Sequence, residues 1–535
     1  MKTLIKHAVV FDGVHPQLQY GDVYLNEDRL EAVGGVIDAP ADQVLDAGGQ
    51  WMTPGFVDIH RHPDLAVFGD SFGQAELAQG ITSVVGGNCG LSPVPMSAAN
   101  EREHRAFLAP CLGETHRGRF EDFQAYRQSL SSVPLPLNMG MLAAVGAIMT
   151  CAKGYDNARF SPEEMKRARW LLQDALEKGA LGVSLGIMYQ PECFASQEEY
   201  VRLLSAATPY GRPLCCHIRG EGASLVQSVE EVLRLAQCVG LPLHISHFKS
   251  TGIRHWRGLI HQAIERIEKA RAQGQDVTVD FYPYDAGAST LLSLVPPQLL
   301  GDQDAFLTSA ATPEGKARMR AAIYRENPQW DNMVQDIGWE RILISSAEGM
   351  DSLAGLDFVS AAKALGVKDP ADALCELLAA TRGKAGVVLQ SMCWDDVKTV
   401  AALPYSMLIS DALYGGGAAH PRQKGAFPRF LKQFVPQVLS WEEALLKMTA
   451  LPAKRLGLRG RGQLRAGNAA DLAVFSPQAL TDRATYAHPE EIAQGMQWVF
   501  VNGQLAWENQ TCTTRDAGRM LLAPKSAEER KVCRG

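Results

Sequence analysis

The chain has 535 residues, 46% hydrophobic and 21% charged, so it is long enough for a large core and a second domain. Its 52 basic and 59 acidic residues give a net charge of −7, which argues against a nucleic-acid surface and favours small-molecule partners. The eleven cysteines follow no regular framework, and we find no secretory leader and no apolar run that could cross a bilayer. We therefore expect a cytoplasmic protein that does not bind membranes.

Both ends of the chain have the character of β-structure. Residues 1–50 contain short alternating segments separated by turn residues, which is typical of hairpins in a small antiparallel unit. Similar segments return in residues 456–510, and we predict that the two parts form one small β-sandwich domain. Residues 511–535 carry basic side chains without periodicity, and we expect a mobile tail.

Residues 51–455 show apolar strands that alternate with amphipathic helices. Capping boxes mark two of the helix starts, one from Ser161 to Glu164 and one from Ser196 to Glu199. The number of strand-helix units predicts an α/β protein with a closed, parallel (β/α)8 TIM barrel, rather than an open doubly wound sheet. No Gly-x-Gly-x-x-Gly sequence opens a helix, which weighs against a dinucleotide-binding fold.

The strand-helix alternation is interrupted at residues 289–339. This stretch contains Pro-Pro-Gln-Leu-Leu-Gly and a charged helix that we expect from Pro313 to Glu326. An insertion here would lie over the mouth of the barrel as a candidate lid. A surface excursion without a role in the site explains the same pattern equally well.

The segment from Phe56 to His62 follows a turn and has the pattern of a short β-strand. Alternate side chains of a strand point the same way, so His60 and His62 project together from one end. Two imidazoles are half of a metal site, but a His-x-His sequence is weak evidence in a chain with thirteen histidines. Whether His60 and His62 belong to a metal site depends on which residues end the other predicted strands.

Several other predicted strands also end in residues that can bind a metal. In a parallel barrel the carboxyl ends of all strands share one face, so residues far apart in sequence meet there. The strand-end set comprises His60, His62, Cys89, His217, His247 and Asp411. Imidazole and thiolate ligands suit zinc, which keeps one position open for water in catalytic sites. Taken singly, Cys89 could be a small buried side chain and Asp411 a helix cap. His244 has the opposite parity to His247, so we expect it to be packed or to support the ligands.

Seven motifs occur at or near these strand ends: Gly55-Phe56-Val57-Asp58-Ile59-His60-Arg61-His62, Gly87-Asn88-Cys89-Gly90-Leu91-Ser92-Pro93, His217-Ile218-Arg219-Gly220-Glu221, Ser246-His247-Phe248-Lys249, Asp280-Phe281-Tyr282-Pro283-Tyr284, Ser410-Asp411 and His420-Pro421-Arg422. With them, nearly the whole chain resembles the D-aminoacylase branch of the amidohydrolase superfamily, the N-acyl-D-amino-acid deacylases. The cysteine is the most specific feature, because most amidohydrolases place a carboxylated lysine or a glutamate in the bridging role.

The resemblance implies a metal centre and a reaction. A tightly bound Zn2+ would be held by Cys89, His217 and His247. A second, weaker metal position, which need not be filled, would be formed by His60 and His62 with Cys89 as the bridge. Asp411 would be the general acid/base, taking a proton from the metal-activated water and passing it to the leaving amine. The implied reaction is hydrolysis of N-acyl-D-amino acids to a carboxylate and a free D-amino acid.

The free carboxylate of such a substrate needs cationic and hydroxyl donors in fixed positions. The resemblance assigns this role to Lys249, Tyr282, Ser289 and Arg422. Arg422 can bind a carboxylate through two parallel hydrogen bonds, whereas Lys249 offers a point charge. For both cations, a solvated loop charge is the alternative explanation.

The sequence departs from the family pattern at two places near the expected substrate. Asp411 is followed by Ala412-Leu413-Tyr414 where relatives usually have Gly-Leu-Pro, and residues 146–147 are Gly-Ala where relatives often have Gly-His. Two other functions stay open. One is another amidohydrolase reaction, such as hydrolysis of a dipeptide or of a cyclic, hydantoin-like amide; a cyclic amide without a free carboxylate would give Lys249, Tyr282 and Arg422 little to bind. The other is a metal-binding barrel without catalysis, against which Asp411 argues. The sequence does not indicate an oligomeric state.

Overall fold

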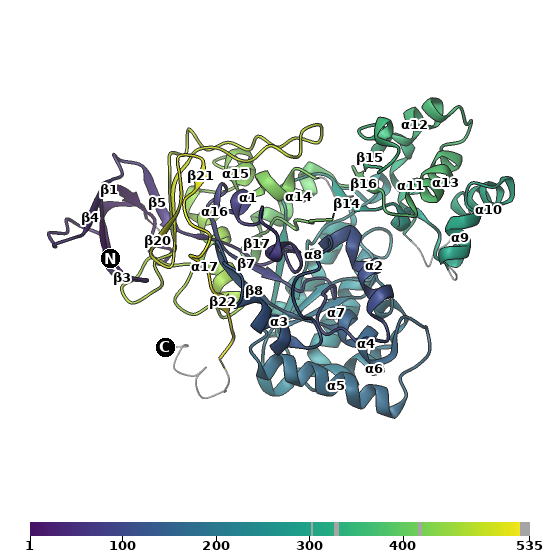
Figure 1. Cartoon of the computed structure of the whole chain (residues 1–535), viewed down its shortest axis with the longest axis horizontal. Helices are drawn as coiled ribbons and strands as arrows, with labels where there is room; N and C mark the ends of the chain where they lie inside the picture. Colours follow the sequence, from purple (N-terminus) through teal and green to yellow (C-terminus); the bar gives the residue numbers. More distant parts are fainter. Residues whose placement is uncertain (16, 301–302, 326–330, 416–419, 525–535) are drawn as a thin grey trace.

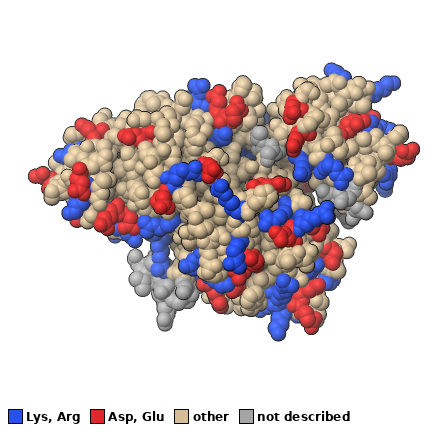
Figure 2. Space-filling view, in the orientation of Figure 1, with Lys and Arg blue, Asp and Glu red and all other residues tan. Residues whose placement is uncertain are grey.

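The computed structural model describes residues 1–15, 17–300, 303–325, 331–415 and 420–524. Figure 1 shows three parts in a row: a β domain that contains the N-terminus, a central barrel, and a mostly helical lobe on the opposite side of the barrel. No helix among the described residues is long and apolar enough to span a membrane. On the face drawn in Figure 2, acidic and basic side chains are interspersed, so no field of one sign covers it.

Eight parallel strands form the barrel. In barrel order they are β6 (Phe56–Asp58), β7 (Ile81–Gly86), β8 (Asn138–Met141) continued by β9 (Ala143–Ala144), β10 (Val183–Gly186), β11 (Leu214–His217), β12 (Leu243–Ile245), β13 (Val277–Phe281) and β17 (Ser406–Leu408). The ring closes where the first and last strands end: the Asp411 N–H donates to the His60 carbonyl oxygen at 2.9 Å, and the His62 N–H donates to that of Ala412 at 3.0 Å. The predicted closed barrel is confirmed.

Amphipathic helices cover the outside of the barrel. They are α1 (Gln74–Leu77), α2 (Glu101–Leu112), α3 (Phe123–Leu130), α4 (Val145–Lys153), α5 (Pro162–Glu177), α6 (Gln197–Leu204), α7 (Leu225–Val239), α8 (Leu259–Ala272), α14 (Trp394–Ala402), α15 (Arg422–Phe434), α16 (Trp441–Met448) and α17 (Ala450–Arg455). Both predicted capping boxes are present. In α5, the Ser161 hydroxyl accepts from the Glu164 N–H at 3.3 Å and the Glu164 carboxylate accepts from the Ser161 N–H at 2.8 Å. Ser196 and Glu199 do the same at the start of α6, so local capping fixes where these helices begin.

Strands from both chain ends form one nine-stranded sheet. They are β1 (Lys2–Val10), β2 (Gln19–Asn26), β3 (Arg29–Val33), β4 (Gln43–Asp46), β5 (Trp51–Pro54), β18 (Leu472–Phe475), β19 (Met496–Val501), β20 (Gln504–Glu508) and β21 (Thr511–Cys512). β5 joins the two ends, because it pairs with β1 on one side and with β18 on the other. The predicted β domain built from both termini is confirmed, although its sheet extends past residues 50 and 510 to include β5 and β21.

The predicted tail is partly ordered. Strand β22 (Met520–Leu521) pairs in parallel with β8 of the barrel, with Met520 opposite Met139. The expectation of a mobile tail is therefore wrong for residues 511–524, because a two-residue strand leaves no periodicity that a sequence pattern can reveal. The remainder of the predicted tail lies outside the described residues.

Between β13 and β17 the chain leaves the barrel and forms a lobe. Its elements are β14 (Gly287–Thr290), α9 (Gln303–Ser309), α10 (Pro313–Ile323), α11 (Met333–Ile337), β15 (Ile342–Ser346), α12 (Phe358–Leu365), α13 (Pro370–Thr381) and β16 (Gly386–Leu389). The three strands form one antiparallel sheet in the order β14-β16-β15, and buried residues between Leu291 and Leu389 form a core separate from that of the barrel. The insertion predicted at 289–339 is therefore too short. The second half of the lobe alternates strands and helices as barrel units do, and the pairing of its strands distinguishes it from such units. Its role as a lid stays a prediction.

Candidate metal centre and substrate wall

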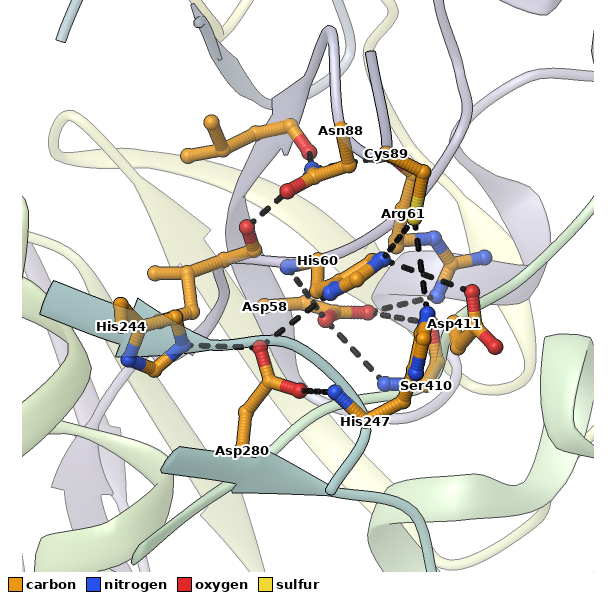
Figure 3. Close-up of polar contacts among 12 residues, drawn as sticks. Asp58, His60, Arg61, Asn88, Cys89, His244, His247, Asp280, Ser410 and Asp411 are labelled. Atoms are coloured by element: carbon orange, nitrogen blue, oxygen red, sulfur yellow. Dashed lines mark hydrogen bonds and ion pairs between the residues drawn. The ribbon is translucent and has the colours of Figure 1, made fainter. Parts of the chain in front are cut away.

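The six predicted ligand and catalytic positions come together at the carboxyl ends of the barrel strands, and Figure 3 shows four of them. In barrel order they are His60 and His62 after β6, Cys89 after β7, His217 at the end of β11, His247 after β12 and Asp411 after β17. All six are buried. The convergence follows from the barrel geometry, which brings strand ends to one face regardless of their separation in sequence.

The Cys89 sulfur lies among imidazoles. Sγ is 3.2 Å from His60 Nε2 and 3.5 Å from His247 Nε2. Burial would raise the pKa of the thiol, but the charge of His60 and the neighbouring imidazoles of His217 and His247 hold that pKa well below its ordinary value. Cys89 also has a left-handed φ of 55°, a conformation that a non-glycine side chain adopts at some cost and that is concentrated at functional sites. The site therefore favours a thiolate, the form of cysteine that binds metals.

His217 provides the test of whether a metal fits here. Its ring centroid lies 4.3 Å from that of His247. Both of its ring nitrogens are buried without a hydrogen-bond partner among the described residues. A buried polar atom left in this way costs on the order of 1–3 kcal/mol, and a bond to a metal would remove that cost. Together with the thiolate, the nitrogen donors form the set that zinc prefers.

His60 and His62 form a second group with Asp411. The Nε2 atom of each histidine lies 3.5 Å from Asp411 Oδ1. Burial would raise the pKa of Asp411, but the Arg422 guanidinium, whose Nη1 is 2.8 Å from Oδ2, holds it well below its ordinary value with help from His62. Asp411 is thus ionised and can accept a proton. Its φ of 50° is left-handed, as in Cys89.

Three of the four predicted carboxylate-binding residues form one wall of the site. The Lys249 ammonium lies 5.7 Å from the centre of the Tyr282 ring, and the Arg422 guanidinium lies 4.7 Å from the same centre. Arg422 is buried, and its Nε has no partner among the described residues. Ser289 is half-buried on β14, where it pairs with Val387 in the sheet of the lobe. Its assignment stays a prediction.

Two carboxylates that the sequence interpretation left without a role contact the candidate ligands. Glu221 Oε1 is 2.9 Å from His247 Nδ1 and 2.6 Å from Lys249 Nζ. Asp280 contacts His60, His244 and His247. Both carboxylates belong to the motifs that carry the family resemblance. Asp280 also has the same strand parity as Tyr282, and this parity could have identified Asp280 as a site residue. His244 supports the ligands, as its parity suggested.

The departures from the family pattern lie behind the ligands. The Tyr414 hydroxyl donates to Glu76 Oε1 at 2.6 Å and accepts from Arg61 Nε at 3.1 Å, so Tyr414 braces the segment that carries the histidine pair. At the other departure the residue that differs is Ala147, and the glycine before it, Gly146, lies where an added Cβ would come within 2.6 Å of the Gly90 carbonyl oxygen. Glycine at position 146 therefore lets α4 approach the loop that carries the cysteine.

The comparisons with known proteins agree with this geometry. A model of the amidohydrolase family matches residues 312–506. The D-aminoacylase of Alcaligenes xylosoxydans xylosoxydans is 32% identical over 522 residues, which cover 97% of both chains. The N-acyl-D-glutamate deacylase of the same organism is 32% identical over 502 residues, covering 94% of this chain and 92% of that one. The structure of N-acyl-D-glutamate deacylase from Bordetella bronchiseptica, complexed with zinc and a phosphonate inhibitor, has a TM-score of 0.81 at 29% identity and covers 97% of this chain and 99% of its own. The chain belongs to the D-aminoacylase family of amidohydrolases.

Proposed function

We propose that this chain is a zinc-dependent hydrolase that converts N-acyl-D-amino acids to a carboxylate and a free D-amino acid. The observation that carries the proposal is the juxtaposition of the Cys89 thiolate and its imidazoles with Asp411 and a cationic wall. The two relatives that act on N-acyl-D-amino acids and the zinc-bound structure support the same reaction. We also propose a cytoplasmic location, which the free thiols of all ten cysteines among the described residues support.

Two metal positions would share Cys89 and differ in their histidines. The tight Zn2+ would be held by Cys89, His217 and His247, and the weaker position by His60 and His62 with Cys89 as the bridge. When bound, zinc lowers the pKa of water and polarises an amide carbonyl. The orphaned ring nitrogens of His217 support the assignment to the tight position.

Asp411 would move the proton during the reaction. Its Oδ1 faces the histidines, so it can take a proton from the attacking water. It then gives that proton to the leaving nitrogen, because an amine departs at neutral pH only when it is protonated. Water adds to the carbonyl carbon, the C–N bond breaks, and no covalent enzyme intermediate is required.

Lys249, Tyr282 and Arg422 would bind the substrate carboxylate, with Ser289 as a further donor. Without substrate, the two cations are paired internally, Lys249 with Glu221 and Arg422 with Asp411. The substrate carboxylate would bind where both cations flank the Tyr282 ring. A free carboxylate is therefore part of what this site recognises.

The experiment that tests the proposal is hydrolysis of a panel of N-acetyl amino acids, with D and L enantiomers side by side, by zinc-loaded protein. The panel includes the N-acetyl derivatives of D-glutamate and of neutral D-amino acids, because one relative is named for N-acyl-D-glutamate and the other is named a D-aminoacylase. We expect release of D-amino acids that disappears in Asp411→Asn. Zinc-containing protein that releases neither enantiomer would contradict the proposed substrate and favour a cyclic amide or a dipeptide.

A further inference from the structure

The Asp280 carboxylate occupies a central place beneath the metal ligands (Figure 3). It lies on β13 and is 1% exposed. Its Oδ2 lies 3.2 Å from His60 Nδ1 and 2.8 Å from His244 Nε2, and its Oδ1 accepts the backbone N–H of His247. Both carboxylate oxygens are thus in use, and they reach residues on and after β12 and a residue after β6.

The first consequence concerns His60. An ionised carboxylate can only accept hydrogen bonds, so the His60 nitrogen that faces Asp280 carries the hydrogen. The other nitrogen, Nε2, is then the one that a metal can bind in place of a proton, and this atom lies between Cys89 Sγ at 3.2 Å and Asp411 Oδ1 at 3.5 Å. Asp280 therefore selects the tautomer of His60 that can bind a metal.

The second consequence concerns His247. Its φ of 34° is left-handed, and its backbone N–H is anchored by Asp280. Its side chain is anchored separately, because Glu221 accepts from Nδ1 at 2.9 Å. Lys249 Nζ is equally close to that nitrogen and also lies 2.6 Å from Glu221 Oε1 and 3.1 Å from the His247 carbonyl oxygen. Asp280 thus sets the backbone of His247, while Glu221 sets its ring.

We propose that Asp280 is a positioning residue that couples the two metal positions, because one carboxylate holds His60 for the weaker position and His247 for the tight one. His244 supports it: its Nε2 bonds Asp280, and its Nδ1 bonds Thr278 Oγ1 at 2.7 Å. The inference rests on the proposed function, since it requires the site to bind metal.

The test compares three variants with the wild type. Asp280→Asn removes the carboxylate that both positions share, His244→Gln weakens only its support, and Glu221→Gln is the matched control because Glu221 contacts His247 but not His60. Each protein is titrated with Co2+ in competition with a chelator. Absorption then reports the geometry of each bound ion and the thiolate-to-cobalt charge transfer from Cys89.

We expect Asp280→Asn to weaken both positions by roughly 10–100-fold each, the usual cost of losing a partner of a metal ligand. Glu221→Gln should weaken only the tight position, with a changed charge-transfer band. His244→Gln should shift both positions in the same direction as Asp280→Asn, by a smaller factor. Each variant is compared with the wild type by circular dichroism.

The coupling is overturned if Asp280→Asn weakens one position alone or neither. If that variant does not fold, His244→Gln decides, and unchanged affinity at both positions overturns the inference. A wild type that binds a single cobalt ion also overturns the coupling but leaves a one-metal function intact. A wild type that binds no metal overturns the proposed function together with the coupling. Metal binding at two coupled positions without turnover of any acyl amino acid would contradict the substrate alone.

Discussion

The two sides of the barrel mouth differ in how their polar groups are satisfied. On the metal side, both ring nitrogens of His217 and one of His62 are buried without partners among the described residues. On the substrate wall, the charged group of Lys249 is paired with Glu221 and that of Arg422 with Asp411. An added ion would therefore satisfy the unpartnered nitrogens on the metal side. On the substrate wall, the substrate carboxylate would replace an internal carboxylate as the partner of a cation.

Removing an orphaned imidazole should have the largest effect. We expect His217→Asn to lose the tightly bound zinc and with it all measurable turnover, because both ring nitrogens of His217 lack partners among the described residues and its ring lies against that of His247. Zinc content by atomic spectroscopy and activity are measured together. Full zinc content in a folded variant would contradict the distinction between the two sides of the mouth.

Removing the base should leave the metal in place. We expect Asp411→Asn to lower kcat by about 10²–10⁴-fold, the range for loss of general acid–base catalysis. The zinc content should stay at the wild-type value, in contrast to the loss in His217→Asn. Steady-state kinetics and metal analysis on the same preparation check this, and a retained kcat would show that another group moves the proton.

Changes in the wall should appear mainly in KM. Loss of a hydrogen bond to a charged group costs about 1.5–3 kcal/mol, so we expect Arg422→Met to raise KM roughly 10–100-fold. Lys249→Met is the matched variant, because it removes the other cation without touching Asp411. A fall in kcat at constant KM in Arg422→Met, but not in Lys249→Met, would assign Arg422 to the base rather than to the substrate.

A partnered histidine provides the contrast to His217. His104 Nε2 donates to the Ser92 carbonyl oxygen at 2.8 Å, and its Nδ1 lies 2.7 Å from the Tyr155 hydroxyl. Burial lowers the pKa of His104 from 6.5 to about 4. As the pH falls, His104 therefore binds a proton in the unfolded chain before it does so in the folded protein. The free energy of unfolding decreases between about pH 6.5 and pH 4, by up to about 3 kcal/mol.

His104→Gln tests this smallest effect. We expect the variant to show a shallower decline in the free energy of unfolding over that pH range and unchanged zinc content. Urea denaturation at pH 7 and at pH 4.5, compared with the wild type, measures the difference. An equal decline in both proteins would mean that other groups account for the acid sensitivity.

Much of the site could be predicted because it depends on local order. Strand parity placed His60 and His62 on one side and distinguished His244 from His247, and strand ends identified Cys89 and Asp411. The helix starts at Ser161 and Ser196 followed from capping boxes, which involve residues three apart.

The features that the sequence interpretation missed depend on pairing between distant segments. Strands β15 and β16 repeat the local pattern of barrel strands but pair with each other, and β16 also pairs with β14 in the lobe. The last strand, at Met520, is too short to show a period and is held by β8. The hydroxyl of Tyr414 bonds Glu76 and Arg61, which lie more than 300 residues earlier in the chain.

By itself, the sequence determined the barrel, the β domain shared by the two termini and the identity of the candidate ligands, because periodicity, parity and capping act over a few residues. Only the tertiary structure decided which carboxylate serves which ligand. Asp280 and His60 are 220 residues apart, yet they come within 3.2 Å. Such contacts are set by closure of the barrel, since hydrogen bonding between its first and last strands brings every strand end to one mouth.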